Sequence, residues 1–223
     1  MADTSETAQC SAVGTEAIWR LPVTVCCLPR FLPEERADAL LQRAVDCAAD
    51  TFSASTVFEG DVVPSVRRSR TRNDFEAPEL VAAIREVLEP VEHVLGVSCR
   101  DTEPGYGLNV HNDGDFYRPH QDTDGVEFQP GRVLTFVYYL HRRPRPFRGG
   151  SLRVFDISLP VHRGEAARWE DRGWRDWEPE HNSIVFFRPT AWHEVRPVSC
   201  PSRRHEDSRF AVNGWFYRTT AGP

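Results

Sequence analysis

Three His-x-Asp triplets are the part of this 223-residue sequence best suited to metal chemistry, and they begin at His111, His120 and His205. On a β-strand, positions i and i+2 face the same side. A histidine and an aspartate at that spacing can therefore offer one nitrogen and one oxygen to the same ion. A third ligand from a distant strand would complete a three-sided site and leave other coordination positions open.

The triplet at His120 has the sequence context that a strand needs. Aromatic residues precede it, and Pro119 pushes Arg118 into extended geometry. The triplet at His111 begins a turn-like stretch, His-Asn-Asp-Gly-Asp, and the triplet at His205 lies in a charged stretch. The ordinary alternative for each triplet is a solvated turn or a hydrogen-bonded histidine.

His193 is the best candidate for the distant third ligand. It follows a hydrophobic run at 183–188 and a proline-containing turn. That run has the length and composition of a buried strand, so the histidine would emerge near its end. The alternative is a core histidine packed beside Trp192. With His120 and Asp122 it would give the two-histidine, one-carboxylate set of non-haem Fe(II) oxygenases.

The composition excludes several other classes of function. All 27 basic residues are arginine, so there is no lysine for a Schiff base, a P-loop or general-base catalysis. A formal net charge of −6 gives no reason to expect binding to nucleic acid or to an acidic membrane. The six cysteines include no Cys-x-x-Cys pair, which predicts reduced, structural thiols and a cytoplasmic location.

The chain is expected to form one domain after a short tail. Residues 1–17 are small and polar, which predicts a disordered N-terminal tail and no secretory signal. No apolar run approaches the length of a membrane span. Residues 18–223 then make a single domain, with helical support over 30–95 and a β-rich core over 100–218.

Hydrophobic periodicity predicts the elements of that domain. A strand at 23–28 precedes two helices, at about 33–48 and 77–94, with an extended arginine-rich stretch at 62–73 between them. A long surface loop is expected at 163–182. The order predicts a mostly β fold, a sandwich or barrel with supporting helices. Its short β-type runs are expected at 107–110, 116–122, 133–141, 151–155, 183–188, 194–198 and 210–217.

Six sequence motifs then occur in a fixed order: Phe116–Asp122, Arg132–Leu140, Gly149–Phe155, Asn182–Phe187, Trp192–Val195 and Ser208–Phe216. This series resembles the prolyl-4-hydroxylase-like branch of the Fe(II)/2-oxoglutarate-dependent dioxygenases over about residues 100–218. The resemblance implies a double-stranded β-helix, the jelly-roll architecture also found in cupins. It makes His120, Asp122 and His193 the iron ligands. The carboxylate of Asp122 implies hydroxylation rather than the halogenation of relatives that lack it.

The resemblance also implies the co-substrate contacts. Arg209 matches the basic residue that binds the distal carboxylate of 2-oxoglutarate. A guanidinium can donate two parallel hydrogen bonds to such a carboxylate, a bidentate interaction. Tyr139 matches a tyrosine that donates to the same carboxylate, and Thr135 would line the pocket on the same strand face. Arg209 follows His193 by sixteen residues. That gap is longer than is usual in the family, which implies a small insertion and leaves Arg203 as a rival anchor.

The candidates for substrate contacts are Trp215, Arg118, His111 and Arg153. Each has an ordinary alternative, as a core tryptophan, a turn histidine or a solvated arginine, and His111 stands where relatives often carry tyrosine. The arginine run at 67–72 is interpreted as a solvated strand edge, with an acidic carrier protein as the alternative partner. Candidates for a lid in the 163–182 loop are Trp169, Trp174 and Trp177.

The expected activity is hydroxylation of an unactivated C–H bond, with release of succinate and CO2. Fe(II) is the expected metal, 2-oxoglutarate and O2 the co-substrates, and ascorbate a candidate reductant. The substrate would be a small molecule such as an amino acid, a peptidyl residue or a carrier-bound residue, and desaturation or cyclisation would use the same chemistry. The rival interpretation is a non-catalytic cupin-type jelly-roll protein that binds a metal or ligand. The sequence leaves substrate identity and oligomeric state open.

Overall fold

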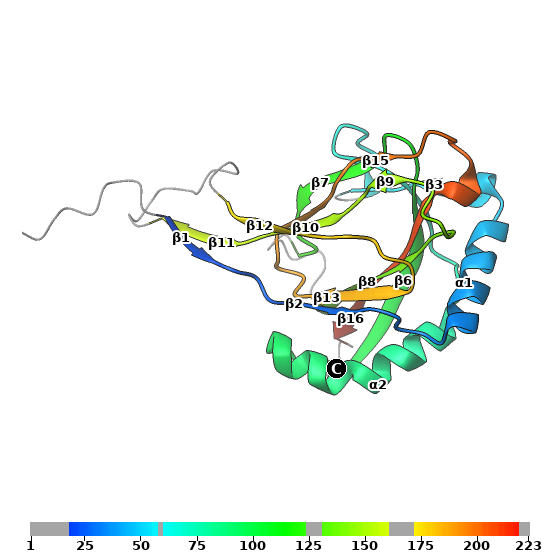
Figure 1. Ribbon diagram of the computed structural model, residues 1–223. Helices are drawn as coiled ribbons and strands as arrows, with labels where there is room; N and C mark the ends of the chain where they lie inside the picture. The colour runs from blue at the N-terminus through cyan, green and yellow to red at the C-terminus, as the bar shows by residue number, and fades with distance from the viewer. Residues whose placement is uncertain (1–17, 58–59, 124–130, 161–171, 219–223) are drawn as a thin grey trace, which may run out of the picture.

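Two antiparallel sheets and two helices make up most of the computed structural model, which describes residues 18–57, 60–123, 131–160 and 172–218 (Figure 1). The larger sheet has seven strands in the order β2-β13-β8-β16-β6-β5-β3. In that order the strands span Val25–Leu28, Ser183–Phe187, Arg132–Leu140, Arg209–Arg218, Thr102–His111, Arg70–Arg72 and Ser53–Ala54.

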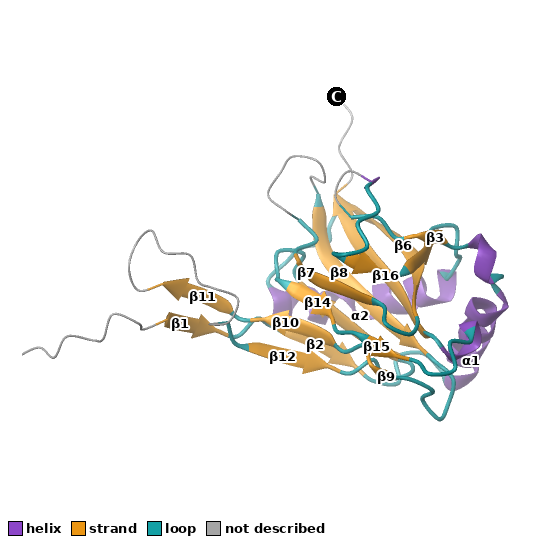
Figure 2. Ribbon diagram, turned by 90° about the horizontal axis from the view of Figure 1, so that it is seen from above, coloured by secondary structure: helices purple, strands orange, loops and turns teal. Residues whose placement is uncertain are grey.

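The smaller sheet has five strands in the order β12-β10-β14-β7-β4 and lies opposite the larger one (Figures 1 and 2). These strands span Trp174–Trp177, Leu152–Phe155, His193–Val195, Phe116–His120 and Arg67–Arg68. The facing antiparallel sheets form the double-stranded β-helix, so the predicted fold class is confirmed. The remaining elements are the strand pairs β1/β11 (Ile18–Leu21, Ile157–Pro160) and β9/β15 (Arg148–Gly149, Val198–Ser199), and short 3-10 helices at Ala49–Thr51 and His205–Asp207.

Strand β8 shows how the sequence separates the hydrophobic core from the space between the sheets. Its even-numbered residues over 134–140 belong to the main core, which they share with the buried faces of both helices. The odd-numbered residues over 135–139 point the other way, because successive side chains of a strand face opposite sides. The inward-facing row therefore combines a hydroxyl, an aliphatic side chain and a phenol in the space between the sheets.

Both helices form where local signals predict them, and their apolar faces cover the larger sheet (Figure 1). Helix α1 (Glu34–Asp46) follows Pro33 and has an acidic first turn, which favours the positive end of the helix dipole. Helix α2 (Pro78–Leu95) has its proline in the first turn and ends at Gly96, whose φ of 60° suits glycine.

The structure corrects three expectations about local structure. The expected loop at 163–182 contains β12, an edge strand whose mostly exposed residues leave no hydrophobic pattern. The turn expected at His111 begins after that residue, because β6 remains paired with β16 through it. The strand expected at 194–198 is divided between β14 and β15. The tail at 1–17 and Trp169 lie outside the described residues.

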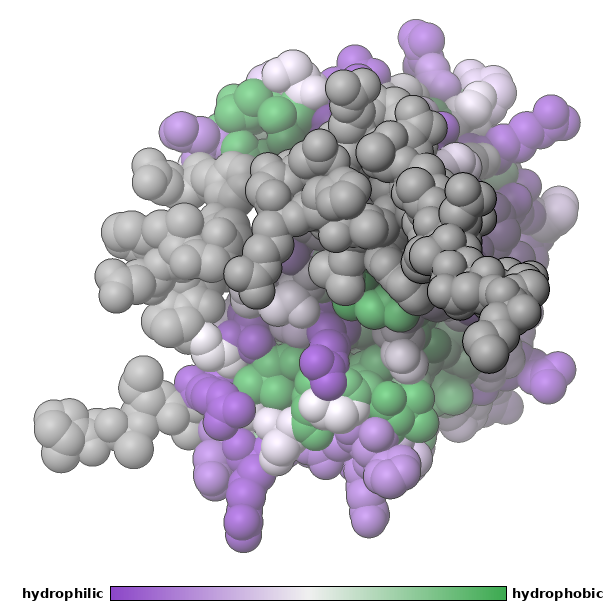
Figure 3. All heavy atoms as spheres, turned by 90° about the vertical axis from the view of Figure 1, so that its left-hand side faces the viewer, coloured by the Kyte–Doolittle hydropathy of each residue, from purple (hydrophilic) through white to green (hydrophobic). Residues whose placement is uncertain are grey.

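The face that carries β1, β11 and β12 is mostly hydrophilic at its rim, with smaller hydrophobic areas between the polar side chains (Figure 3). Large apolar side chains about half exposed on these strands are Leu21 (48%), Ile157 (50%) and Trp174 (52%). Among the helices of the described chain, none combines the length and the hydropathy needed to cross a bilayer. The cytoplasmic location stays a prediction.

Asn182 joins the segment that leads into α1 to the neighbouring strands β8 and β13. Its side chain is 1% exposed, and its backbone has a φ of 59°. Oδ1 accepts hydrogen bonds from the Leu32 N–H at 2.9 Å and the Tyr138 hydroxyl at 2.8 Å. Nδ2 donates to the carbonyl of Leu32 at 2.8 Å. One amide therefore satisfies three buried polar groups.

We expect Asn182→Ala to lower the free energy of unfolding by about 3 kcal/mol, because it leaves those three groups buried and unpaired. Urea denaturation checks this. The matched control is Glu180→Ala, an exposed position two residues away in the same turn, which should change stability by less than about 0.5 kcal/mol. Similar midpoints for the two variants would contradict the role of Asn182.

Candidate metal and co-substrate site

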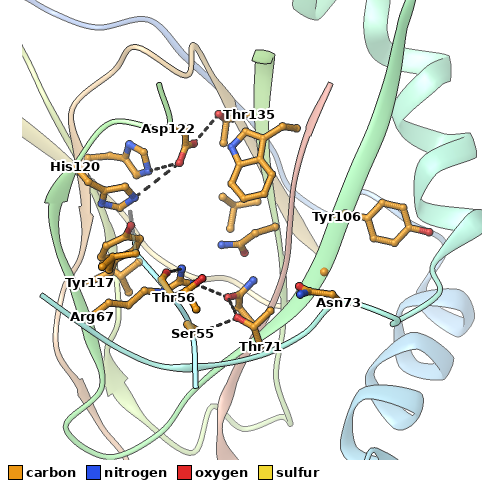
Figure 4. Close-up of a pocket in the computed structure, with 18 of the residues that line it drawn as sticks. Ser55, Thr56, Arg67, Thr71, Asn73, Tyr106, Tyr117, His120, Asp122 and Thr135 are labelled. Atoms are coloured by element: carbon orange, nitrogen blue, oxygen red, sulfur yellow. Dashed lines mark hydrogen bonds and ion pairs between the residues drawn. The ribbon is translucent and has the colours of Figure 1, made fainter. Parts of the chain in front are cut away.

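The three candidate metal ligands meet in the space between the sheets (Figure 4). His120 ends β7 and His193 begins β14, and the pairing of these strands sets the two histidines opposite each other. Asp122 follows two residues after β7. Its Oδ1 lies 3.8 Å from Nε2 of His120 and 3.7 Å from Nε2 of His193. All three ligand atoms lie within 4.8 Å of one another, which suits one metal ion.

Hydrogen bonds fix which nitrogen of each histidine faces that ion. Nδ1 of His120 lies 2.8 Å from the carbonyl oxygen of Arg118, and Nδ1 of His193 lies 2.9 Å from that of Ala191. A carbonyl oxygen can only accept, so both Nδ1 atoms carry the proton and donate. Burial, and then the neighbouring His193, lower the pKa of His120 well below its ordinary value. Its Nε2 therefore offers a lone pair at neutral pH.

Two residues of β8 orient Asp122. The Thr135 hydroxyl donates to Oδ2 at 2.8 Å, which leaves Oδ1 turned towards the histidines. Nη1 of Arg132 donates to the Asp122 backbone carbonyl at 2.7 Å. Burial acts to raise the pKa of this carboxyl, but the two histidines, the nearby Trp215 indole and Thr135 hold it below its ordinary value. Asp122 is therefore ionised at neutral pH, as a metal ligand must be.

A cavity of about 1100 Å³ opens beside the triad. That volume is large enough for an organic ligand in addition to a metal ion. Part of its wall is apolar and is formed by Val137, Leu152, Phe187 and Val195. Another part offers neutral hydrogen-bonding groups. They come from Asn109, Asn213 and the labelled Ser55, Thr71 and Asn73 of Figure 4.

Arg209 lines the same cavity and begins β16, with only 1% of its surface exposed. Its Nε donates to the carbonyl of Gly150 at 2.8 Å, and its guanidinium lies 4.9 Å from the ring centre of Tyr139. No carboxylate in the described part of the chain pairs with it. Burial therefore lowers the pKa of this arginine. A buried cation in this state fits a ligand that brings its own carboxylate.

Two neighbours make that arrangement possible. Gly150 has a φ of 72°, and a Cβ there would come within 2.8 Å of Cδ of Arg209, so the Gly-Gly turn lets the arginine reach the interior. Within the described residues, the buried phenol oxygen of Tyr139 has no hydrogen-bond partner of good geometry, and the nearby charged group is Arg209. Burial raises the pKa of Tyr139 to about 12, so the hydroxyl keeps its proton and can donate. The guanidinium of Arg209 and the hydroxyl of Tyr139 can therefore both bind an anionic ligand.

Three of the other predicted site residues also line the cavity: Thr135, Trp215 and His111. Arg118 and Arg153 do not line it. Arg118 is exposed and lies over Phe116, 4.9 Å from the ring centre. Arg153 forms ion pairs with Asp176 at 2.7 Å and Glu194 at 3.8 Å. The two arginines are therefore engaged on the outside of the smaller sheet.

The rival anchor Arg203 lies at the surface. Its side chain is 77% exposed, and its Nε lies 3.1 Å from a carboxylate oxygen of Asp113. Residues between 197 and 208 form β15 and a 3-10 helix, which accounts for the long spacing between His193 and Arg209. Only Arg209 of the two arginines lines the cavity.

Sequence reasoning missed Arg67, which was expected at a solvated strand edge. It lines the cavity, and its Nη2 donates to Oδ1 of Asn109 at 2.7 Å. Its guanidinium lies 4.6 Å from the ring centre of Tyr117, whose ring stacks on His120 at 3.5 Å. No pattern within the 67–72 run marks it, because all six residues are polar and strand alternation is recognised from a contrast between apolar and polar residues.

A comparison with models of protein families shows which family the chain belongs to. A model described as the 2OG-Fe(II) oxygenase superfamily matches residues 106–217, about half of the sequence. The chain therefore belongs to the 2OG-Fe(II) oxygenase superfamily, which confirms the family expected from the ordered motifs. The match spans the three candidate metal ligands and Arg209.

Individual relatives agree with this membership. The chain is 32% identical over 201 residues to an uncharacterized PKHD-type hydroxylase of Synechocystis sp., covering 88% of this chain and 64% of that protein's length. A Pseudomonas putida prolyl-4-hydroxylase has a TM-score of 0.62 at 22% identity, covering 88% of this chain and 94% of that chain. A prolyl hydroxylase from Trichoplax adhaerens, solved with a hypoxia inducible factor peptide, has a TM-score of 0.62 at 17% identity, covering 87% and 83%. The solved structures share the fold.

We expect Thr135→Val to weaken the binding of Mn(II) by about tenfold, because Asp122 loses the donor that orients it. Titration calorimetry under anaerobic conditions measures the affinity. Thr102→Val is the matched control, since this buried hydroxyl donates to the Cys99 carbonyl at the far end of β6. Its affinity should equal that of the wild type. Equal affinities for all three proteins would contradict the orienting role.

Proposed function

We propose that this protein is an Fe(II)- and 2-oxoglutarate-dependent dioxygenase that hydroxylates an unactivated C–H bond and releases succinate and CO2. The observation that carries the proposal is the buried Arg209, which has no carboxylate partner among the described residues and lines the same cavity as the two-histidine, one-carboxylate triad. Buried charges and buried unpaired donors are costly unless a ligand completes them. The family match supports the same reaction.

In this proposal, each group of the site has a defined task. Nε2 of His120, Nε2 of His193 and Oδ1 of Asp122 hold the metal. Bound there, Fe(II) supplies the O2-dependent oxidation that amino-acid side chains cannot perform. Arg209 binds the distal carboxylate of 2-oxoglutarate through its guanidinium, and the Tyr139 hydroxyl donates a hydrogen bond to the same carboxylate. The apolar part of the wall keeps water away from the reacting groups.

The substrate in this proposal is an amino-acid, peptidyl or carrier-bound residue. The prolyl hydroxylase of Trichoplax adhaerens was solved with a peptide, which supports a peptidyl substrate here. Trp215 supplies an aromatic wall for it, and Arg132 lies over that indole, 3.9 Å from the ring centre. Arg118 and Arg153 are not included among the proposed substrate contacts, because neither residue lines the cavity.

We expect His193→Ala to lower succinate formation from 2-oxoglutarate by at least about 100-fold, because the triad loses one of its three ligands. The assay contains Fe(II) and ascorbate, and metal content is measured in parallel. His93→Ala, an exposed histidine on α2, is the control and should retain full activity and metal content. Full turnover by the His193 variant would refute the metal site.

We expect Arg209→Ala to raise the KM for 2-oxoglutarate by about 100-fold, because the carboxylate then loses its charged partner in a buried site. Arg203→Ala is the matched control, since this exposed arginine pairs with Asp113 and should leave the KM unchanged. Steady-state succinate release measures both values. The reverse ranking would make Arg203 the anchor.

A further inference from the structure

His111 is the histidine of the cavity that the metal triad does not use. It ends β6, is 1% exposed and is paired in register with Arg209 on β16. Its Nδ1 lies 3.4 Å from Nη1 of that arginine. Its Nε2 is buried and has no hydrogen-bond partner in the described part of the chain. The ring therefore contacts the buried cation on one side and presents an unused polar atom on the other.

The contact with Arg209 fixes the tautomer of His111. A guanidinium has no acceptor, so it donates and Nδ1 of the imidazole receives the hydrogen bond through its lone pair. Burial, followed by the charges of Arg209 and Arg67, lowers the pKa of His111 well below its ordinary value. The ring is neutral at physiological pH, and its single proton is on Nε2. That N–H is a buried donor without a partner in the described part of the chain, on a residue that lines the cavity.

The same strand holds a second arginine of the cavity, the half-buried Arg67, in the same way. Asn109, two residues before His111 and on the same face of β6, accepts a hydrogen bond from Nη2 of Arg67 at 2.7 Å. Both arginines are thus oriented by neutral acceptors. An acidic residue in either place would orient the guanidinium equally well, but it would also cancel the positive charge. A neutral acceptor leaves that charge available to a ligand.

We propose that His111 belongs to the anchor for the distal carboxylate of 2-oxoglutarate, where its Nδ1 positions Arg209 without neutralising it and its Nε2–H donates directly to the carboxylate. This inference rests on the proposed function and extends it. It moves His111 from the substrate contacts to the co-substrate contacts. It also gives a chemical reason for a neutral residue at this position, which is that the buried arginine must remain an unpaired cation until the anion binds.

The test compares His111→Asn with His111→Asp in the full chain, loaded with Mn(II) under anaerobic conditions and titrated with 2-oxoglutarate by calorimetry. Asparagine offers Arg209 a neutral oxygen but removes the Nε2–H donor, so the affinity should fall about tenfold. Aspartate offers a carboxylate that pairs with Arg209, so the affinity should fall at least about 100-fold. Without ligand, the Asp variant should unfold at a temperature no lower than that of the Asn variant.

Oxalate is the control ligand, because it chelates a metal ion but has no distal carboxylate. Its affinity should stay within about twofold in the wild type and both variants. Equal 2-oxoglutarate affinities for the two variants would overturn the role of His111, and so would a matching loss of oxalate binding or an unfolded Asp variant. A wild-type protein that binds oxalate but not 2-oxoglutarate would instead overturn the proposed function.

Discussion

The positive charge of Arg209 is the constraint around which the interior of this protein is arranged. A fully buried guanidinium costs several kcal/mol unless groups nearby replace its hydration. Here those groups are all neutral: the Gly150 carbonyl, the His111 imidazole and the face of the Tyr139 ring. The arginine can be held in this state because β16 is paired along its length with β6 on one side and β8 on the other. The paired strand β16 therefore holds the charge of Arg209 in a position where the carboxylate of a ligand could pair with it.

Strand β8 couples the stability of the fold to the geometry of the site. Its outward row packs with both helices in the core, while its inward row carries Thr135 against Asp122 and Tyr139 against Arg209. A change of register by one residue would exchange the two rows, because side chains alternate along a strand. The same hydrophobic packing that drives folding therefore determines which polar groups reach the metal ligand and the buried arginine.

The sequence allowed the family and much of the local structure to be predicted, but it did not determine which side chains reach the cavity. The metal candidates and Arg209 were identifiable because ordered motifs surround them. Arg67 was misinterpreted because its direction depends on the pairing of β4 with β7, which lies outside its own segment. His111 was assigned to a turn from its neighbours, whereas β16 extends β6 through it. Arg118 was a candidate substrate contact, yet its side chain is exposed on the same sheet. Each error concerns orientation set by strand pairing.

Charge balance links the two ends of the cavity. Asp122 contacts Thr135 and Arg209 lies over Tyr139, four residues further along β8, so the two β8 residues that contact these charges lie about 13 Å apart along the strand. A divalent metal alone adds two positive charges to this interior, and 2-oxoglutarate alone adds two negative ones. Bound together, the two ligands add no net charge to this interior, and in the proposed arrangement each carboxylate of 2-oxoglutarate lies beside a cation. Because binding free energies are reciprocal, each ligand must then favour the other. A neutral His111 preserves this balance, whereas an acid at its position would satisfy Arg209 before the co-substrate arrives.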